Sequence, residues 1–569
     1  MNIPSFFMLF RRAIRSFSRK EEIFSLVFFV LLLFSGYHIF FGGNAALSPD
    51  EFSDMPTSGG AYSEGLIGRV MRLNPLYTEF NAVDRDISRL VFSGLSQYDP
   101  VTGEIVEDLA THSLSSDKKT YTFTVKDNVF WHDGEPVTAE DVYFTYHDII
   151  QSENFKNFIL RSNFDGVDIK IIDKKTITFT LSEVNSFFFS NTTIGLLPKH
   201  ILGGMNPADL DAIEFNQMPI GSGPYKMDGP VKNFNKEESQ VNLMAFDGYY
   251  GEKPRISNVR FFTFPDEKAL YKARNSLNGL SRITVKEEIE ELSRSGRYQL
   301  FPYTLPQYTA FFLNMESPIA KEYLVRLALA KSLDRTALVK ELSYKKQIDT
   351  ALLELSLQNS LFRVSRENAM GALYASGWRY REDDVEKKGW RVSASGKVLE
   401  LRLVAQSFSE NTARKAETEA VIAFAKKAWE GVGVKITVEM YDQEIFEKKV
   451  KKSDYDILLS GQALGYNMDT YSYWHSSQVS GNGLNVSNYK NPVADNLIEA
   501  IRNIFDPEVK RAKLEKLAET IASDIPALFL YSPVYYFSVD SRIKGVSIGW
   551  LAFPSDRLTH LVKWYIKER

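Results

Sequence analysis

The sequence predicts an α/β protein that is built from several domains. Three observations support this prediction. Strand-like and helix-like hydrophobic patterns alternate along the chain. The length of 569 residues is more than one ordinary hydrophobic core supports. Hydrophobic residues make up 44% and charged residues 25%, which is typical of folded rather than disordered chains.

An apolar stretch near the N-terminus, Ile23–Phe41, is the predicted transmembrane anchor. It spans 19 residues, and a membrane-crossing helix needs about 20. The segment before it holds five basic and two acidic residues, and basic flanks stay in the cytoplasm. We therefore expect a cytoplasmic basic segment at 1–22, a single-pass anchor at 23–41 and a tether at 42–60. The large remainder is expected outside the cytoplasm, in the periplasm or at the cell surface. A cleaved signal peptide is the alternative, although its apolar core is usually only about 7–15 residues long.

A strand, a helix and a hairpin can be predicted in the first half of the exported part. Lys119–Val125 alternates with a period of two, as a half-buried strand does. Thr138–Ile150 has helical spacing, and Thr138 with Asp141 stands in the positions of a capping box. Lys170–Leu181 is expected to form a hairpin that turns at Asp173 to Lys175.

The second half of the sequence predicts a β-sheet in which some of the strands are parallel. A helix is expected at Asn411–Trp429, followed after Gly431 and Gly433 by an alternating strand from Val434 to Met440. Tyr455–Leu459 is a short continuous apolar run, which is typical of a strand buried on both faces. Helix, strand and buried strand in this order favour an α/β layer with parallel strands.

Composition and motifs exclude several classes of function. Lys and Arg number 68 against 72 Asp and Glu, so no basic excess exists for binding nucleic acid. The absence of cysteine excludes disulfides, thiolate metal sites and a lipid-modified N-terminal Cys. The sequence contains no G-x-S-x-G, no H-E-x-x-H and no phosphate loop, and His132-Asp133 stands in a turn-like Trp-His-Asp-Gly. We therefore predict no enzyme activity, no catalytic residue, no metal site and no cofactor.

Several segments, in a fixed order, resemble the family 5 extracellular solute-binding proteins, which are the oligopeptide- and dipeptide-binding proteins of ABC importers. The resemblance rests on the following motifs: Leu73-Asn74-Pro75, Val91-Phe92-Ser93-Gly94-Leu95, Val129-Phe130-Trp131-His132-Asp133-Gly134 with Thr138-Ala139-Glu140-Asp141-Val142, Pro219-Ile220-Gly221-Ser222-Gly223-Pro224-Tyr225, Phe312-Leu313-Asn314, Asp334-Arg335 and Asp524-Ile525-Pro526-Ala527. It runs from about Leu73 to Trp564.

The resemblance implies a two-lobed fold of the periplasmic-binding-protein type that closes on a ligand. Lobe one is expected at 61–265, with an inserted subdomain. Lobe two is expected at 266–530, and 531–569 should return to lobe one. The chain would cross between the lobes near Pro265 and near Tyr531.

The resemblance also implies a ligand site between the lobes, where a peptide adds a strand to exposed backbone. The candidate ligand-binding residues are Phe92, Ser93, Gly94, Leu95, Asn314, Ser460, Gly461, Gln462, Ala463, Leu464, Gly465, Tyr466, Asn467, Asp469 and Trp474. For Asn314 a structural role is an alternative, for Trp474 a place in the core, and for Gly461 and Gly465 a role as turn glycines.

One position departs from the family pattern. The family's aspartate that holds the amino group of a peptide corresponds to Gly465 in this sequence. A buried ammonium needs a counter-charge, so the usual amine anchor is in doubt. Asp469 is either its replacement or a residue that caps the loop.

The resemblance predicts a membrane-anchored substrate-binding protein that delivers a peptide-like solute to the permease subunits of an ABC transporter. The alternative is a ligand sensor or cell-envelope scaffold that has this fold and no transport role. The identity of the solute, whether peptide, sugar or metal chelate, does not follow from the sequence.

Overall fold

The computed structural model describes residues 59–353, 355, 357, 362–386, 388–408, 412–466, 468–479 and 483–567. The predicted anchor Ile23–Phe41, almost all of the predicted tether and the candidate ligand residue Asn467 lie outside these residues. Within the described ranges, no helix combines the length and the apolar character that crossing a membrane requires.

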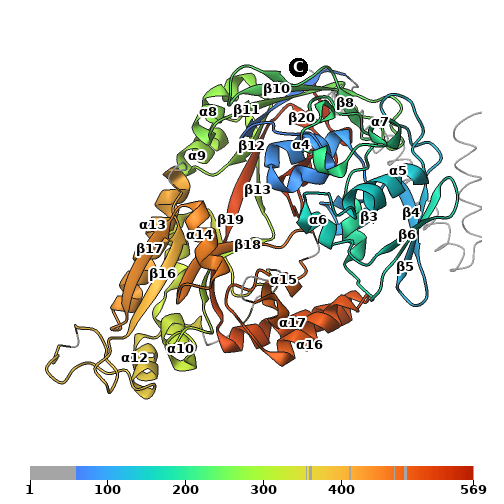
Figure 1. Ribbon diagram of the computed structural model, residues 1–569. Helices are drawn as coiled ribbons and strands as arrows, with labels where there is room; N and C mark the ends of the chain where they lie inside the picture. Colours follow the sequence, from blue (N-terminus) through green and yellow to red (C-terminus); the bar gives the residue numbers. More distant parts are fainter. Residues whose placement is uncertain are drawn as a thin grey trace, which may run out of the picture. The chain divides into compact units, whose positions relative to one another are not determined.

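A sheet of 13 strands forms the centre of residues 59–566 (Figure 1). Its main path runs in the order β17 (Lys435–Tyr441), β16 (Glu400–Gln406), β18 (Ile457–Ala463), β14 (Gln307–Leu313), β19 (Ala527–Asp540), β12 (Gly279–Ile283), β1 (Ala61–Ile67), β11 (Asn258–Phe264), β10 (Ser239–Ala245) and β8 (Tyr225–Met227). Three further strands join this path from the side: β13 (Tyr298–Thr304) and β15 (Lys345–Gln347) pair with β19, and β9 (Lys232–Asn233) pairs with β10.

The 14-residue strand β19 divides this sheet into two halves. Its first residues, up to Tyr531, pair with β14, whereas the residues from Val534 onward pair with β13 and β12. We call the strands β14, β16, β17 and β18 with residues 527–531 the β18 half. The β1 half comprises β1, β8 to β13 and residues 534–540.

Different helices cover the two faces of the β18 half. One core contains residues of α10 (Tyr323–Ser332), α11 (Arg335–Leu342), α12 (Arg366–Ala375) and α13 (Thr412–Glu430). The other core contains residues of α14 (Gln443–Lys451), α15 (Tyr471–Trp474), α16 (Pro492–Arg502) and α17 (Pro507–Asp524). Figure 1 shows α16 and α17 side by side. Ile457 and Leu459 belong to the first core and Leu458 to the second, which confirms the predicted strand with two buried faces.

The parallel part of the sheet is confirmed as well. β16 pairs in parallel with both β17 and β18. The predicted helix 411–429 corresponds to α13, and the predicted strand that follows it corresponds to β17.

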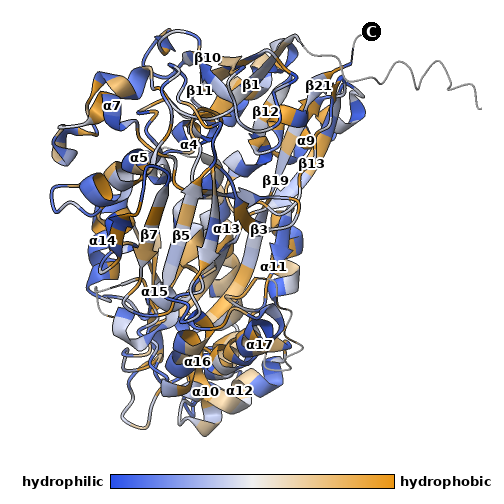
Figure 2. Ribbon diagram, turned by 90° about the vertical axis from the view of Figure 1, so that its right-hand side faces the viewer, coloured by the Kyte–Doolittle hydropathy of each residue, from blue (hydrophilic) through white to orange (hydrophobic). Residues whose placement is uncertain are grey.

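A separate four-stranded sheet stands between β1 and β8 in the chain. Its order is β4 (Ala110–Leu114), β5 (Thr120–Val125), β7 (Thr176–Thr180) and β6 (Asp168–Ile171). The predicted strand at 119–125 and the predicted hairpin at 170–181 are therefore confirmed. The hydropathy colouring in Figure 2 shows hydrophobic residues on β7.

The predicted helix at 138–150 begins as an α-helix and continues as a π-helix. α5 (Ala139–Tyr143) carries the predicted capping box of Thr138 and Asp141, and the π-helix η2 (Phe144–Ile150) follows directly. Thr145 Oγ1 donates a 2.8 Å hydrogen bond to the carbonyl of Asp141. That carbonyl is the acceptor that an uninterrupted α-helix would offer to the Thr145 N–H, so the side chain competes with the regular ladder.

Most of the remaining short elements surround the β1 half and the separate sheet, whereas η8 lies beside α15. They are η1 (Pro75–Phe80), α4 (Ala82–Val91), β2 (Ser96–Asp99), β3 (Glu104–Glu107), α6 (Phe158–Ser162), η3 (Phe188–Thr193), α7 (Lys199–Leu202), η4 (Pro207–Asp209), η5 (Glu214–Gln217), α8 (Glu267–Ala273), η6 (Arg274–Ser276), α9 (Lys286–Arg294), η8 (Ser476–Gln478), β20 (Ile543–Lys544), η9 (Pro554–Leu558), η10 (Leu561–Lys563) and β21 (Tyr565–Ile566).

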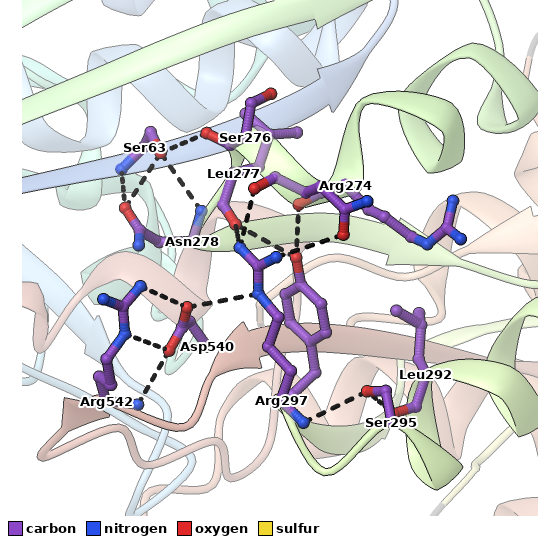
Figure 3. A network of polar contacts seen from close by, with 12 residues as sticks. Ser63, Arg274, Ser276, Leu277, Asn278, Leu292, Ser295, Arg297, Asp540 and Arg542 are labelled. Atoms are coloured by element: carbon purple, nitrogen blue, oxygen red, sulfur yellow. Dashed lines mark hydrogen bonds and ion pairs between the residues drawn. The ribbon is translucent and has the colours of Figure 1, made fainter.

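Polar contacts tie together the ends of four strands of the β1 half (Figure 3). Arg542 Nη2 donates to Asp540 Oδ2 at 2.8 Å, and Arg297 Nε lies 3.6 Å from the same oxygen. On the neighbouring strands the Ser63 N–H donates to Asn278 Oδ1 at 2.9 Å. These contacts connect β1 with β12, β13 and β19, and the last three strands all follow Pro265 in the sequence.

Candidate ligand-binding site

β18 has one edge that is paired along its whole length and one that is not. β14 pairs with every residue of β18, from Gln307 opposite Ala463 to Leu313 opposite Ile457. β16, on the other edge, pairs only with Ile457, Leu458 and Leu459. In the described part of the sheet, Ser460–Ala463 thus has a strand neighbour on one edge only. Such an edge can accept another extended chain as an added strand.

A pocket of about 400 Å³ lies beside this part of β18. Its wall consists of Ser460, Gly461, Gln462 and Ala463 together with Phe446, Glu447, Val450, Lys451, Ser453, Tyr473, Gly483, Leu484, Asn485 and Val486. Pockets that bind small molecules typically have about 300–1,000 Å³. The structure therefore places four of the predicted ligand residues on the wall of one pocket of suitable size.

Two side-chain hydrogen bonds shape the rim of this pocket. Gln462 Nε2 donates to the carbonyl of Leu484 at 3.2 Å, and the Tyr473 hydroxyl donates to the carbonyl of Ala463 at 2.5 Å. Both bonds link β18 to segments that follow it in the chain. Tyr473 also lines the pocket.

The other predicted ligand segment, Phe92–Leu95, is buried at the end of α4. The carbonyls of Ser93, Gly94 and Leu95 accept hydrogen bonds of 3.0 to 3.2 Å from the N–H groups of Leu196, Leu109 and Asp108, respectively. A Cβ on Gly94 would lie 2.8 Å from the carbonyl of Thr193, so glycine allows the close approach of this neighbouring backbone. These carbonyls are committed to the protein's own backbone, and the segment is not part of the pocket wall.

Tyr466, in the loop after β18, contacts β2 and η9, and η9 is bonded to β1 of the β1 half through Arg557 and Glu64. The Tyr466 hydroxyl donates to Asp556 Oδ1 at 3.0 Å. Its ring centroid lies 5.0 Å from that of Tyr98 and 4.8 Å from that of Phe553. Gly465, just before it, has a φ of +71°, a conformation that favours glycine, which supports a role as turn glycine. Tyr98 follows Leu95 by three residues, so Tyr466 brings the two predicted ligand segments close to each other.

Asp469 is engaged by its own loop and by α16. Its Oδ1 accepts a hydrogen bond of 3.0 Å from the Tyr471 N–H, and its Oδ2 lies 3.0 Å from Arg502 Nε. Asp469 and Arg502 line a second, polar cavity of about 300 Å³ rather than the pocket beside β18. The contacts agree with the loop-capping role, and the carboxylate already has a cationic partner.

Three further candidate residues lie away from the pocket wall. Asn314 follows the end of β14 opposite Ile457, at the other end of the strand from Gln307. Its amide nitrogen donates to the carbonyls of Ser453 and Tyr455 at 3.1 and 2.9 Å, which is a structural role. Trp474 is 1% exposed within the core beneath β18, and Leu464 is buried there too.

Buried charges surround the contact that Tyr466 makes. Asp556 is fully buried, and burial raises the pKa of its carboxyl group. Arg557 is also fully buried, and its Nε donates to Glu64 Oε1 at 3.0 Å while its Nη2 donates to Asp86 Oδ2 at 2.8 Å. Sequence reasoning did not find Asp556, Arg85 or Arg89 beside Tyr466. The only signal for the two arginines was their i, i+4 spacing in a segment just before Val91.

Comparison with known proteins gives a consistent result. The model of the bacterial extracellular solute-binding proteins, family 5 Middle, matches residues 104–483. The chain is 25% identical over 547 residues to the oligopeptide-binding protein AppA of Bacillus subtilis (strain 168), which covers 92% of this chain and 94% of that protein. It is 23% identical over 495 residues to the dipeptide-binding protein of Escherichia coli (strain K12), covering 80% of this chain and 86% of that protein.

Solved structures share the two-lobed α/β fold. AppA from Bacillus subtilis in complex with a nonapeptide has a TM-score of 0.69 at 23% identity, over 90% of this chain and all of that chain. The substrate-binding protein CtaP from Listeria monocytogenes has a TM-score of 0.73 at 24% identity, over 90% of this chain and all of that chain. The family model covers more than half of the sequence, and the expected motifs stand in their expected order. The chain belongs to the bacterial extracellular solute-binding proteins, family 5.

Proposed function

We propose that this protein captures a peptide-like solute outside the cytoplasm and delivers it to the permease of an ABC transporter. The observation that carries the proposal is the unpaired edge of Ser460–Ala463 beside a pocket of about 400 Å³. A peptide that pairs with this edge would be held by its backbone, which tolerates many side chains. Relatives named as oligopeptide- and dipeptide-binding proteins support a peptide as the solute.

The β18 half and the β1 half would be the two lobes that close on the solute. The predicted boundaries near Pro265 and Tyr531 remain proposals. Strand pairing favours a first crossing later than Pro265, because β12 and β13 pair with the β1 half. We place it at Leu305-Pro306, between β13 and β14. This segment lies next to the second crossing: the Ser532 hydroxyl donates to the carbonyl of Leu305 at 3.4 Å.

The proposed anchor is Ile23–Phe41, with the described domain outside the cytoplasm. The basic flank before the apolar stretch supports this orientation. Protease added to intact cells should then digest the large domain and spare the cytoplasmic end. Protection of the large domain would contradict this orientation.

Mass spectrometry of a peptide mixture retained by the purified protein tests the proposed site. Wild-type protein should retain peptides, and Ser460→Trp should lose at least tenfold in affinity because the indole fills the pocket beside β18. Ser395→Trp, at an exposed turn outside the pocket wall, is the matched control and should bind as the wild type does. Retention of peptides by Ser460→Trp at unchanged affinity would place the site elsewhere.

An uptake assay distinguishes a transport function from the alternative of a sensor or scaffold. Cells that lack this protein should take up a retained peptide more slowly, and the wild-type gene should restore the rate. Unchanged uptake in the presence of proven binding would favour the sensor.

A further inference from the structure

A short segment beside the four-stranded sheet, Ser186-Phe187, contacts the helices α16 and α17. It stands between β7 and η3 in the chain. The Ser186 N–H donates to the carbonyl of Arg502 at 2.6 Å, and the Ser186 hydroxyl donates to the carbonyl of Ile501 at 3.4 Å. Both carbonyls belong to the last turn of α16, where a helix leaves its backbone acceptors to donors from outside. Ser186 is therefore bound to the end of α16 through its backbone and its side chain.

Lys510 of α17 contacts the same segment from a second side. Its Nζ donates to Ser186 Oγ at 2.8 Å and lies 4.5 Å from the centroid of the Phe187 ring. Phe187 itself packs against the core that contains residues of α14 to α17. Burial lowers the pKa of the Lys510 amino group, and the nearby charge of Asp469 opposes this change. The ammonium has thus exchanged part of its hydration for a hydrogen bond and a contact with an aromatic ring.

These contacts join parts of the chain that lie on different sides of the two crossings. The chain reaches the four-stranded sheet from β1 and returns from it to β8, and both strands belong to the β1 half. The helices α16 and α17 lie between the crossing at Leu305-Pro306 and the crossing at Ser532-Pro533. The polar cavity of about 300 Å³ borders the contact, with Phe187 and Arg502 on its wall. The two sides therefore meet here through a few bonds and one ring, which a separation of the halves would break.

We infer that Ser186, Phe187 and Lys510 form a latch that holds the two halves closed and thereby retains a bound solute. This inference rests on the proposed function and concerns the regulation of the same site. None of the three latch residues belongs to the wall of the pocket beside β18, so the latch acts on closure rather than on the peptide. A contact that exists only in the closed state stabilises this state equally for every bound peptide. The latch should therefore slow the release of all solutes by the same factor.

The experiment measures how fast peptides leave the protein. Wild-type protein is loaded with an equimolar set of isotope-labelled synthetic peptides of three to nine residues and then mixed with an excess of the unlabelled set. Mass spectrometry quantifies the labelled peptides that remain bound over time. Lys510→Met keeps an apolar chain beside Phe187 and removes the charged donor to Ser186. It should release every retained peptide about tenfold faster, because a hydrogen bond from a charged donor is lost in the closed state.

A double-mutant cycle tests whether Ser186 and Lys510 act together. Ser186→Ala removes the acceptor of the lysine, so the combined variant should release peptides less than the product of the two single effects would require. Lys513→Met removes a positive charge from an exposed position of the same helix and should leave all release rates unchanged. Thermal unfolding identifies any variant that fails to fold, and Ser186→Ala provides the test if Lys510→Met does not fold.

The outcomes separate this inference from the proposed function. Release from Lys510→Met at the wild-type rate would overturn the latch and leave peptide binding in place. An acceleration confined to some of the peptides would also overturn it, because Lys510 would then contact the peptide itself. The same holds for single effects that multiply in the double variant, since the two residues would then act independently. Retention of no peptide by the wild type would overturn the proposed function and the inference with it.

Discussion

The contacts of Asp469 bear on the two roles that the sequence left open, the amine anchor and the loop cap. Its carboxylate accepts the Tyr471 N–H and pairs with Arg502, so a peptide ammonium would have to compete with a cation that is already in place. Peptides with a free amino terminus should therefore bind no better than their N-acetylated forms, because the ammonium loses hydration without gaining a fixed counter-charge. Calorimetry on a matched peptide pair measures the difference.

The variant Asp469→Asn completes this test. It should leave the ratio of the two affinities unchanged, although it removes the ion pair with Arg502. A preference of at least tenfold for the free amine that disappears in Asp469→Asn would show that Asp469 is the amine anchor after all.

His132 is a second residue whose surroundings determine its chemistry. Its Nε2 donates to the carbonyl of Gly223 at 3.1 Å and its Nδ1 accepts from the Gly221 N–H at 3.2 Å, so the neutral ring joins two loops. Burial lowers its pKa to about 4 from an ordinary value of 6.5. Between these pH values the unfolded chain binds more protons than the folded protein, so the contribution of His132 to stability is present above pH 6.5 and is lost as the pH falls toward 4.

The free energy of unfolding of the wild type, compared with that of His132→Asn, measures this effect. Their difference should shrink as the pH falls through this window, by up to about 3 kcal/mol if the full shift of the pKa is realised. Urea titrations at several pH values give both free energies. A difference that stays constant from pH 7 to pH 4 would contradict the lowered pKa of His132.

At the scale of elements, local patterns predicted strands and helices well. The period of two at Thr120–Val125, the capping box of α5 and the apolar run of β18 each depend on neighbours in the chain, and each is present in the structure. The change to a π-helix after Tyr143 coincides with the hydrogen bond from the Thr145 hydroxyl to the Asp141 carbonyl and leaves no trace in the hydrophobic spacing.

The candidate site was predicted less completely, because it depends on contacts between distant parts of the chain. The segment after Leu459 was found through the family motif order. Its unpaired edge, however, follows from where β16 stops pairing, and Phe553 meets Arg85 only because η9 packs against α4. Neither the unpaired edge nor the packing of Phe553 against α4 could be predicted from spacing along the sequence.

Trp474 belongs to the core of the β18 half rather than to a groove. It is 1% exposed, and its ring centroid lies 5.9 Å from that of Phe529 on β19. Trp474→Ala should lower the free energy of unfolding by about 3–5 kcal/mol, because a large buried side chain leaves a cavity. Urea denaturation measures this, and Trp550→Ala is the control, since Trp550 is 62% exposed and should change stability by less than about 1 kcal/mol. Equal effects of the two substitutions would contradict the core position of Trp474.

At the scale of the whole described domain, the proposed capture of a solute requires the two halves to move relative to each other. The chain passes between them at Leu305-Pro306 and at Ser532-Pro533, and Tyr466 and Asp556 form a contact that separation of the halves would break. Addition of a retained peptide should therefore reduce the radius of gyration in solution scattering, because the closed state is favoured by the ligand. An unchanged scattering profile at a saturating concentration of a peptide proven to bind would contradict lobe closure.

Amide hydrogen exchange at β18 tests whether a bound peptide adds a strand to this sheet. If a bound peptide adds a strand to the free edge, the backbone amides within Ser460–Ala463 that face this edge acquire acceptors and should exchange at least tenfold more slowly with a retained peptide present. Ile457 to Leu459, which β16 and β14 already pair on both edges, should change little and serve as the internal reference. Unchanged exchange at Ser460–Ala463 with the peptide bound would contradict the strand-addition site.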